Sequence, residues 1–245
     1  MIEAELYELG TVGITERDLP QEECELEAFF TAPFDPPPRL AGLAPEWREH
    51  SGAANTWVDG FEPFAVGQRL YVVPAWRADA VPPGRLRLAV HARQASGSGY
   101  QPATQLALEA IERHLCPRDR FLDVGTGSGI LSAAAGLLGS GLRFACDLDL
   151  AALAEARENQ TPALLFGGSA RSVASRSIDL VAANLNAEAL LSLREDLLRV
   201  LAPGGRLVLS GFTARNVDRL TADFAAEVVE PLQSGNWRAL VLRQR

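Results

Sequence analysis

The sequence predicts an α/β protein built on a doubly wound, Rossmann-like sheet that ends in an antiparallel hairpin and follows a small α+β domain. Three observations lead to this fold class. The stretch Phe121–Asp147 (FLDVGTGSGILSAAAGLLGSGLRFACD) reads as strand, glycine turn, helix and strand. Helices and apolar strands continue to alternate from residue 151 to 242, which is typical of a parallel sheet. A proline cluster at Pro33–Pro38 separates a short N-terminal segment from the remainder.

The composition limits the class of protein and its partners. The 245 residues are 47% hydrophobic, enough for a large core, and the net charge of −8 disfavours direct binding to a nucleic-acid backbone. The cysteines and histidines are widely spaced, so the sequence predicts no disulfide framework and no metal site (Cys24, Cys116, Cys146, His50, His91, His114). The N-terminus lacks the pattern of a signal peptide, and no apolar run reaches membrane-spanning length. We therefore expect a cytoplasmic protein without a membrane partner.

We expect three segments along the chain: a small N-terminal domain at 1–45, a linker helix at 46–60 and a catalytic domain at 61–245. The N-terminal domain should contain a helix at Glu3–Leu9, a strand at Val12–Thr15 and a half-buried strand at Glu23–Phe30. A core of about 40 residues is marginal by itself, and a helix opening on Met1 leaves no strand in front of it. We expect the N-terminal domain to be shortened.

The catalytic domain should open with a loop at Phe61–Gly67 and two strands, Arg69–Pro74 and Arg85–His91, joined as a hairpin by Pro82–Gly84. A loop of small residues at 94–102 then leads into an amphipathic helix at Thr104–Leu115. Beyond Asp147 the expected helices are Ala151–Asn159, Ala187–Leu201 and Asn216–Phe224. The expected strands are Ala163–Phe166, Ile178–Ala183, Arg206–Ser210 after a turn at Pro203–Gly205, and the hairpin of Val228–Leu232 with Trp237–Leu242.

The glycine turn favours a nucleoside with a positively charged group. Its glycines are Gly125, Gly127 and Gly129, but Ile130 occupies the place of the third glycine of a dinucleotide site, which argues against a nicotinamide dehydrogenase. Asp123 precedes the turn, where a carboxylate repels a pyrophosphate and attracts a cation. Asp147 ends the next strand, 22 residues after the first glycine, and suits the two ribose hydroxyls. A glycine-rich turn of some other α/β domain is the plainer alternative.

The apolar-Asp-apolar-G-x-G-x-G pattern resembles motif I of the class I S-adenosylmethionine-dependent methyltransferases. Almost the whole chain resembles one family among them, the methyltransferases of large-subunit ribosomal protein eleven (the PrmA family). The segments that carry this resemblance follow in order: LYELGTVGITE, FEPFAVGQRLYVVPAW, LDVGTGSGIL, CDLD, DLVAANLNA and LAPGGRLVLSG. The resemblance implies S-adenosylmethionine as the cofactor and transfer of methyl groups to protein amines, from lysine side chains or an N-terminus.

Carried over residue by residue, the resemblance implies cofactor contacts from Thr104, Gly125, Asp147 and Asn184, with Asn184 also positioning the incoming amine as the catalytic residue. Each of these residues has a plainer explanation: a helix cap, turn geometry, a solvated strand end and a turn residue. From the residues themselves we add three further cofactor-binding candidates (Asp123, Gly127, Gly129).

The chain departs from the family in the loop before the first catalytic helix. The family pattern F-G-T-G-x-H-x-T-T is replaced by a sequence with Ser96, Gln101 and Ala103 in place of Phe, His and the first Thr. The Asn184–Ala187 segment also lacks the Asn-Pro-Pro-Tyr motif of some amine methyltransferases. Other hypotheses therefore stay open: methylation of another protein or of a small molecule, or cofactor binding without activity. We expect a monomer with a basic protein partner, although the acidic N-terminal residues also suit an ordinary solvated strand face.

Overall fold

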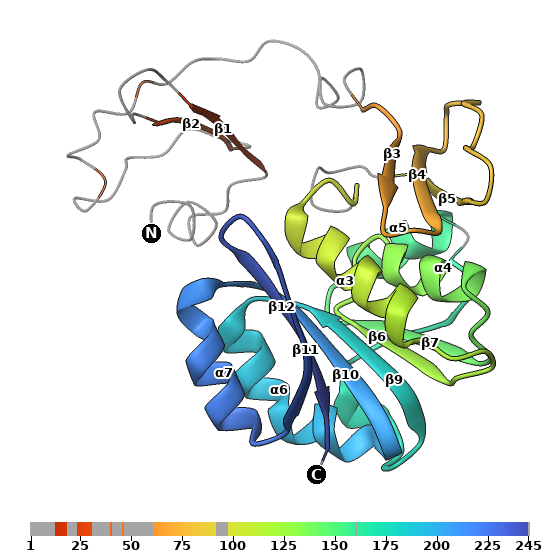
Figure 1. The fold of residues 1–245 in the computed structure, drawn as a ribbon, viewed down its shortest axis with the longest axis vertical. Helices are drawn as coiled ribbons and strands as arrows, with labels where there is room; N and C mark the ends of the chain where they lie inside the picture. Colours follow the sequence, from red (N-terminus) through yellow and green to blue (C-terminus); the bar gives the residue numbers. More distant parts are fainter. Residues whose placement is uncertain are drawn as a thin grey trace. The chain divides into compact units, whose positions relative to one another are not determined.

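The computed structural model describes residues 13–18, 24–30, 40, 46, 61–91, 98–159 and 161–244. The chain forms two compact units, Met1–Gly60 and Phe61–Arg245 (Figure 1). The helix expected at Glu3–Leu9 and the linker helix expected at 46–60 lie outside the described residues, apart from Glu46. Within the described part, no helix is long and apolar enough to cross a membrane.

The N-terminal unit contains an antiparallel pair of strands, β1 (Gly13–Asp18) and β2 (Cys24–Phe29). Their register runs from the pair Gly13↔Phe29 to the pair Asp18↔Cys24. The strand expected at Glu23–Phe30 from its alternation is present as β2, and the strand expected at Val12–Thr15 is present as β1, which extends to Asp18.

The second unit is built on a seven-stranded sheet with the order β11-β12-β10-β9-β6-β7-β8. Strands β6 to β10 pair in parallel, while β12 is antiparallel to both β10 and β11. The strands are β6 (Phe121–Val124), β7 (Arg143–Asp147), β8 (Leu164–Gly167), β9 (Ile178–Asn184), β10 (Leu201–Thr213), β11 (Glu227–Ser234) and β12 (Trp237–Arg243). The doubly wound sheet with a terminal hairpin is therefore confirmed.

Helices cover the sheet in two groups. Helix α3 packs against α4 and against β9 to β12, while α6 packs against α7, β9 and β10 (Figure 1). The helices are α3 (Pro102–His114), α4 (Ile130–Leu137), α5 (Leu150–Glu158), α6 (Ala187–Val200) and α7 (Val217–Phe224), with short 3₁₀ turns at Ala170–Ser172 and Ala214–Asn216.

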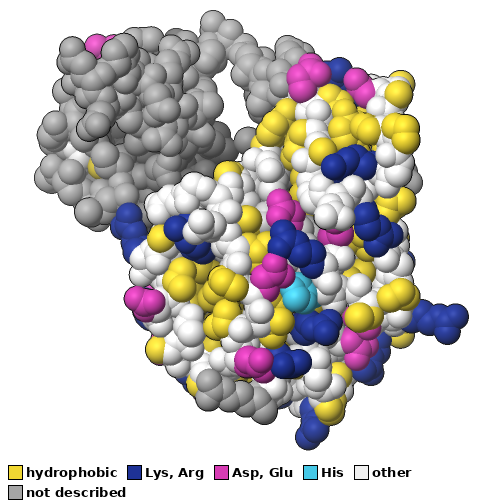
Figure 2. All heavy atoms as spheres, viewed as in Figure 1, with side chains coloured by type: hydrophobic (Ala, Val, Ile, Leu, Met, Phe, Trp, Pro, Cys, Tyr) yellow, Lys and Arg dark blue, Asp and Glu magenta, His cyan; other side chains and the backbone are white. Residues whose placement is uncertain are grey.

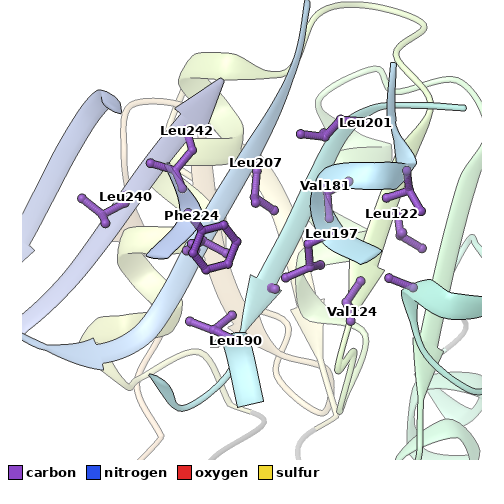
Figure 3. Close-up of a cluster of buried hydrophobic side chains, with 14 of the residues drawn as sticks. Leu122, Val124, Val181, Leu190, Leu197, Leu201, Leu207, Phe224, Leu240 and Leu242 are labelled. Atoms are coloured by element: carbon purple, nitrogen blue, oxygen red, sulfur yellow. The ribbon is translucent and has the colours of Figure 1, made fainter. Parts of the chain in front are cut away.

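Alternation along the central strands divides their side chains between two faces of the sheet. Leu122, Val181 and Leu207 point into the core beneath α6 and α7, together with Leu190, Leu197 and Phe224 of those helices (Figure 3). Because successive residues of a strand point to opposite faces, the neighbouring positions 123, 182, 184, 208 and 210 face the side covered by α3 and α4. The polar candidates of the site lie on this second face.

A separate three-stranded sheet precedes the seven-stranded sheet along the chain, with the order β3-β4-β5, and it corrects two expectations. Its strands are β3 (Phe64–Val66), β4 (Leu70–Pro74) and β5 (Leu86–Val90). The loop expected at Phe61–Gly67 thus contains a strand, which forms the hairpin with β4.

The expected hairpin of β4 with β5 is wrong, because these two strands are parallel. The turn at Pro82–Gly84 is only local, with the Arg85 N–H bonded to the Pro82 carbonyl at 3.1 Å. Between the end of β4 and this turn, the chain returns along the sheet to the level of Leu70, the first residue of β4. Strand β5 therefore starts beside Leu70 and runs in the same direction as β4. The guanidinium of Arg87 holds this crossover by donating to the carbonyl of Asp79 at 2.9 Å.

The segment expected as a turn before the fifth strand is also part of a strand. Strand β10 already begins at Leu201, which pairs with Ile178, and its register shifts before Arg206. Pro203–Gly205 is therefore an irregularity within β10 rather than a separate turn.

Candidate active site

The polar candidates gather at the carboxyl ends of the central parallel strands, where ligands of doubly wound sheets bind. Strand β6 leads into the glycine turn, β7 ends at Asp147 and β9 ends at Asn184. Strand β10 passes beside the end of β9, with Ser210 paired to Asn184. Four strands therefore contribute to one edge of the sheet.

Asp147 holds the glycine turn in place. Its Oδ2 accepts a hydrogen bond from the Gly127 N–H at 3.0 Å, and its Oδ1 accepts one from the Asp149 N–H at 3.0 Å. The turn is also tied to the end of β7, because the N–H groups of Gly125 and Thr126 both donate to the Cys146 carbonyl. Each carboxylate oxygen retains a lone pair, so the half-buried Asp147 can still accept hydrogen bonds from two neighbouring ribose hydroxyls.

The three glycines of the turn differ in what surrounds them. A Cβ on Gly125 would lie 2.4 Å from the side chain of Leu185, and one on Gly129 would lie 2.1 Å from Oγ1 of Thr161. Side chains therefore crowd both positions, and both glycines also adopt left-handed φ values of +73° and +82°. A Cβ on Gly127 would meet nothing within 4 Å. Gly127 is thus the turn residue whose backbone is open to close approach by a ligand.

Asp123 lies beneath the turn and is wholly buried. Its Oδ2 accepts hydrogen bonds from the Thr126 hydroxyl at 2.8 Å, the Ser132 hydroxyl at 3.1 Å and the Ser132 N–H at 3.2 Å. Desolvation outweighs these bonds and raises the pKa of Asp123 to about 6. The carboxyl therefore fixes the first turn of α4 and, when ionised, places a negative charge behind the glycine turn.

Thr104 and Asn184 come together although they are 80 positions apart. Nδ2 of Asn184 donates to Oγ1 of Thr104 at 3.1 Å, and the hydroxyl of Ser210 donates to Oδ1 of Asn184 at 3.0 Å. Thr104 is buried in the first turn of α3, whose N-cap is Gln101. Thr104 is therefore not the helix cap, and its side chain joins α3 to β9 and β10.

Only part of the altered loop before α3 is described, and Ser96 lies outside that part. The ring of Tyr100 stacks on Phe64 with 4.6 Å between centroids, and its hydroxyl donates to the Glu62 carbonyl at 2.6 Å. Gly99 adopts a φ of +84°, and a Cβ there would lie 2.8 Å from Ile130. The loop thus passes closely over the start of α4 and is anchored to the small sheet.

Two residues of this edge were missed by sequence reasoning. Ser210 contacts Asn184, and the signal for it was a serine at the end of a predicted neighbouring strand. Leu148 follows Asp147 and is 79% exposed. Its apolar side chain is free to contact a ligand bound beside Asp147.

His114 is not placed to act as a base beside Asn184. His114 bonds to Glu230 at 2.6 Å at the far end of α3, about 15 Å along the helix from Thr104. His91 follows β5 at the small sheet. Burial raises the pKa of the Cys146 thiol to about 12, so this cysteine stays protonated. No group of three or more potential metal-binding side chains occurs in the described ranges.

The fold and this site define a class I S-adenosylmethionine-dependent methyltransferase, and a solved structure agrees. The crystal structure of a ribosomal protein L11 methylase from Lactobacillus delbrueckii subsp. bulgaricus superposes with a TM-score of 0.68 at 26% sequence identity. The match covers 76% of this chain and 98% of that one.

Sequence comparison gives the family. The profile of the family described as ribosomal protein L11 methyltransferase (PrmA) matches residues 46–245, so the chain belongs to this family. A protein of that name from Desulfosudis oleivorans is 36% identical, with 78% of this chain and 67% of that protein covered. A protein of the same name from Ralstonia nicotianae is 30% identical, with 96% and 89% covered. The resemblance noted in the sequence is confirmed.

The buried carboxyl of Asp123 provides a test of whether S-adenosylmethionine fits. Oδ1 of Asp123 is buried and makes no hydrogen bond within the described part of the chain. A buried carboxylate with an unused oxygen next to an open backbone favours a cationic ligand over a phosphate. S-adenosylmethionine carries a sulfonium and an ammonium group, and the residues present therefore fit it.

Proposed function

We propose that this chain transfers methyl groups to amino groups of ribosomal protein L11, either on lysine side chains or at the N-terminus. One observation carries the proposal: the Asn184 amide is fixed between Thr104 and Ser210, at the same edge of the sheet as the glycine turn and Asp147. A cofactor site and a polar group suited to an amine are thus adjacent. The names of the relatives supply the substrate.

In this proposal, each cofactor-binding residue acts on a different part of S-adenosylmethionine. Asp147 binds the ribose hydroxyls, Gly127 offers its open backbone, and Leu148 covers the base. Asp123 stabilises the positive charges through its field, since its side chain is wholly buried. Thr104 lies toward the methionine end, because it contacts Asn184 rather than Asp147. Gly125 and Gly129 contribute by shaping the turn. S-adenosylmethionine, when bound, supplies an activated methyl group on its sulfonium.

The catalytic role belongs to Asn184. An amine attacks a methyl group only in its neutral form, with its lone pair aligned with the bond that breaks. Oδ1 of Asn184 accepts one hydrogen bond from Ser210 and can accept a second from an N–H of the amine. This contact orients the amine without removing a proton. The ammonium proton leaves to water, and exclusion of water from the site lowers the pKa of the amine.

A ribosomal protein substrate also bears on the roles of the N-terminal domain and the surface charge. We propose that residues 1–45 form the recognition domain, joined by a 46–60 linker, and that their acidic residues attract a basic protein. Figure 2 shows basic and acidic side chains interspersed with apolar ones on the face viewed, a pattern unlike a nucleic-acid surface. Action on a ribosomal protein supports a cytoplasmic location. Action as a monomer stays a prediction, which light scattering after gel filtration would check.

The proposal is tested by transfer of labelled methyl groups to purified ribosomal protein L11. We expect label on the substrate with the wild type and none with Asp147→Ala. Asp149→Ala is the matched control, because that carboxylate only caps α5, accepting from the Ala151 N–H at 2.8 Å. Mass spectrometry of the product locates the methyl groups on lysine or on the N-terminus.

The result that contradicts the proposal is intact binding of S-adenosylmethionine without label on ribosomal protein L11. Label on other proteins or on small molecules of a cell extract would then support a different acceptor. The absence of label from the whole extract would support a cofactor-binding protein without activity.

A further inference from the structure

The hydroxyl of Ser210 is the starting point. Ser210 is wholly buried within β10, where it pairs with Asn184 of β9. Its Oγ donates to Oδ1 of Asn184 at 3.0 Å. Because the Ser210 hydroxyl is closed to solvent and bonds to Asn184, we expect its effect on a substrate to act through the Asn184 amide.

The main chain of Ser210 and Gly211 also contacts the residue that follows Asn184. The Leu185 N–H donates to the Ser210 carbonyl at 3.0 Å. Gly211 follows with a φ of +91°, and a Cβ there would lie 2.5 Å from the Leu185 carbonyl oxygen. The Ser210–Gly211 pair thus fixes both the backbone after β9 and the side chain at its end.

In the structure, the Asn184 amide lies between two hydroxyl groups. With Ser210 donating to Oδ1, the Nδ2 group faces Thr104 and donates to its oxygen at 3.1 Å. The Thr104 hydroxyl then keeps its own proton for another acceptor, and Oδ1 keeps a lone pair for an N–H donor. A rotated amide would present a donor where an incoming amine also presents N–H groups.

We propose that Ser210 is a positioning residue for methyl transfer, which holds the Asn184 amide with its oxygen toward the amine. The proposal rests on the proposed function, in which Asn184 orients the amine. It adds a role for a residue that touches neither the cofactor nor the substrate. Ser210 should therefore affect the transfer step and leave cofactor binding almost unchanged.

A merely structural role makes a different prediction. If the Ser210 hydroxyl only satisfies a buried polar group, its removal lowers stability, and any loss of activity is the same whether or not Asn184 is present. If Ser210 acts through Asn184, the two losses of kcat are not additive. Once Asn184 has been replaced by alanine, replacing Ser210 as well should cause no further loss. A double-mutant cycle in kcat separates these cases.

The experiment compares Ser210→Ala, Asn184→Ala and the double variant, with labelled S-adenosylmethionine and ribosomal protein L11. We expect Ser210→Ala to lower kcat about tenfold, since misalignment of a reacting group by about 1 Å can cost up to a hundredfold. The dissociation constant for S-adenosylmethionine should change less than about twofold, and the double variant should match Asn184→Ala. Ser210→Cys keeps the size and a weak donor, so its kcat should be intermediate.

Ser140→Ala is the matched control, because it also removes a buried hydroxyl, one that lies before β7 at the opposite end of the sheet and contacts Arg143. Its kcat should equal that of the wild type. The proposal is overturned if Ser210→Ala keeps full kcat, if cofactor affinity falls in parallel, or if the loss persists in the Asn184→Ala background. Full activity of Asn184→Ala would instead contradict the role of Asn184 in the proposed function.

Discussion

The buried carboxyl of Asp123 should cost the folded protein stability, and Asp123→Asn tests this directly. Asparagine has nearly the same shape and keeps one oxygen for the hydrogen bonds from Thr126 and Ser132, but it cannot ionise. Asp123 is wholly buried, and desolvation raises its pKa from 3.8 to about 6. The variant therefore separates the charge of residue 123 from its hydrogen bonds.

The magnitude follows from the pKa. The pKa of Asp123 rises from 3.8 to about 6 on folding. Each pKa unit corresponds to about 1.4 kcal/mol, so at pH 8 the ionised carboxylate destabilises the folded protein by about 3 kcal/mol relative to the unfolded chain. The amide of the variant would instead place an NH₂ group where Oδ1 has no partner in the described structure, which costs about 1–3 kcal/mol. At pH 8 we expect Asp123→Asn to be as stable as the wild type or more stable by up to about 2 kcal/mol.

The dependence on pH has a definite sign. The folded protein binds the Asp123 proton more tightly than the unfolded chain, so this group stabilises the fold most below pH 3.8 and loses that contribution as pH rises through about 6. The difference in unfolding free energy, variant minus wild type, should therefore increase by about 1.5 kcal/mol between pH 5 and pH 8. Urea denaturation at the two pH values measures it, and other titrating groups cancel in the difference.

The same variant should bind S-adenosylmethionine more weakly at pH 8, by about tenfold, or about 1.4 kcal/mol of lost charge interaction. Binding to the wild type should weaken toward pH 5, as Asp123 becomes protonated, while binding to the variant should not. Isothermal titration calorimetry measures both. A stability difference that is equal at pH 5 and pH 8 would refute the raised pKa. Equal affinities at pH 8 would refute the electrostatic role and leave Asp123 as a support for the turn.

Three further predictions concern the turn, the strand β10 and the loop. Asp147→Ala should weaken S-adenosylmethionine binding at least tenfold in calorimetry, whereas Asp149→Ala should lower only stability, by about 1 kcal/mol for a lost helix cap. Gly211→Ala should lower the unfolding free energy, measured in urea, by more than about 2 kcal/mol, because its Cβ would lie 2.5 Å from a backbone oxygen. Gly204→Ala is the control: its φ is +78° but the space around it is open, so the cost should be about 1–2 kcal/mol. Tyr100→Phe keeps the ring stacking and loses two hydrogen bonds to the residue 62 backbone, so unfolding free energy should fall by less than about 1 kcal/mol, given its 41% exposure.

The sequence predicted the catalytic sheet well because its signals are local. The strand before the glycine turn is apolar except for Asp123 and is buried on both faces. Asp147 ends β7, as expected from an acid closing an apolar run. Thr104 and Asn184 meet because parallel strands end at one edge of the sheet and α3 begins there. In each case a nearby pattern, combined with the geometry of a doubly wound sheet, is sufficient.

The failures concern pairings that local patterns do not encode. Pro82–Gly84 forms a real turn, but the strand that β5 pairs with depends on the crossover before it, where Arg87 donates to the Asp79 carbonyl. Local patterns also do not show that Leu185, which follows a different strand, lies over Gly125, whose contact with the cofactor stays a prediction. Ser210 acquires its contact only from the register of β9 with β10.

The altered loop shows why a changed motif need not change the site. Gln101 stands where the family has His, but its side chain makes no capping bond; its carbonyl begins α3 by accepting from the N–H groups of Thr104 at 2.9 Å and Gln105 at 3.1 Å. The side chain of Gln105 in turn donates to the Tyr100 carbonyl at 2.9 Å. Ala103 is buried, so a second threonine hydroxyl is absent from the packed side of the helix. Main-chain bonds and Tyr100 thus keep Thr104 at Asn184, and the substitutions should alter the acceptor side of the reaction before they alter cofactor binding.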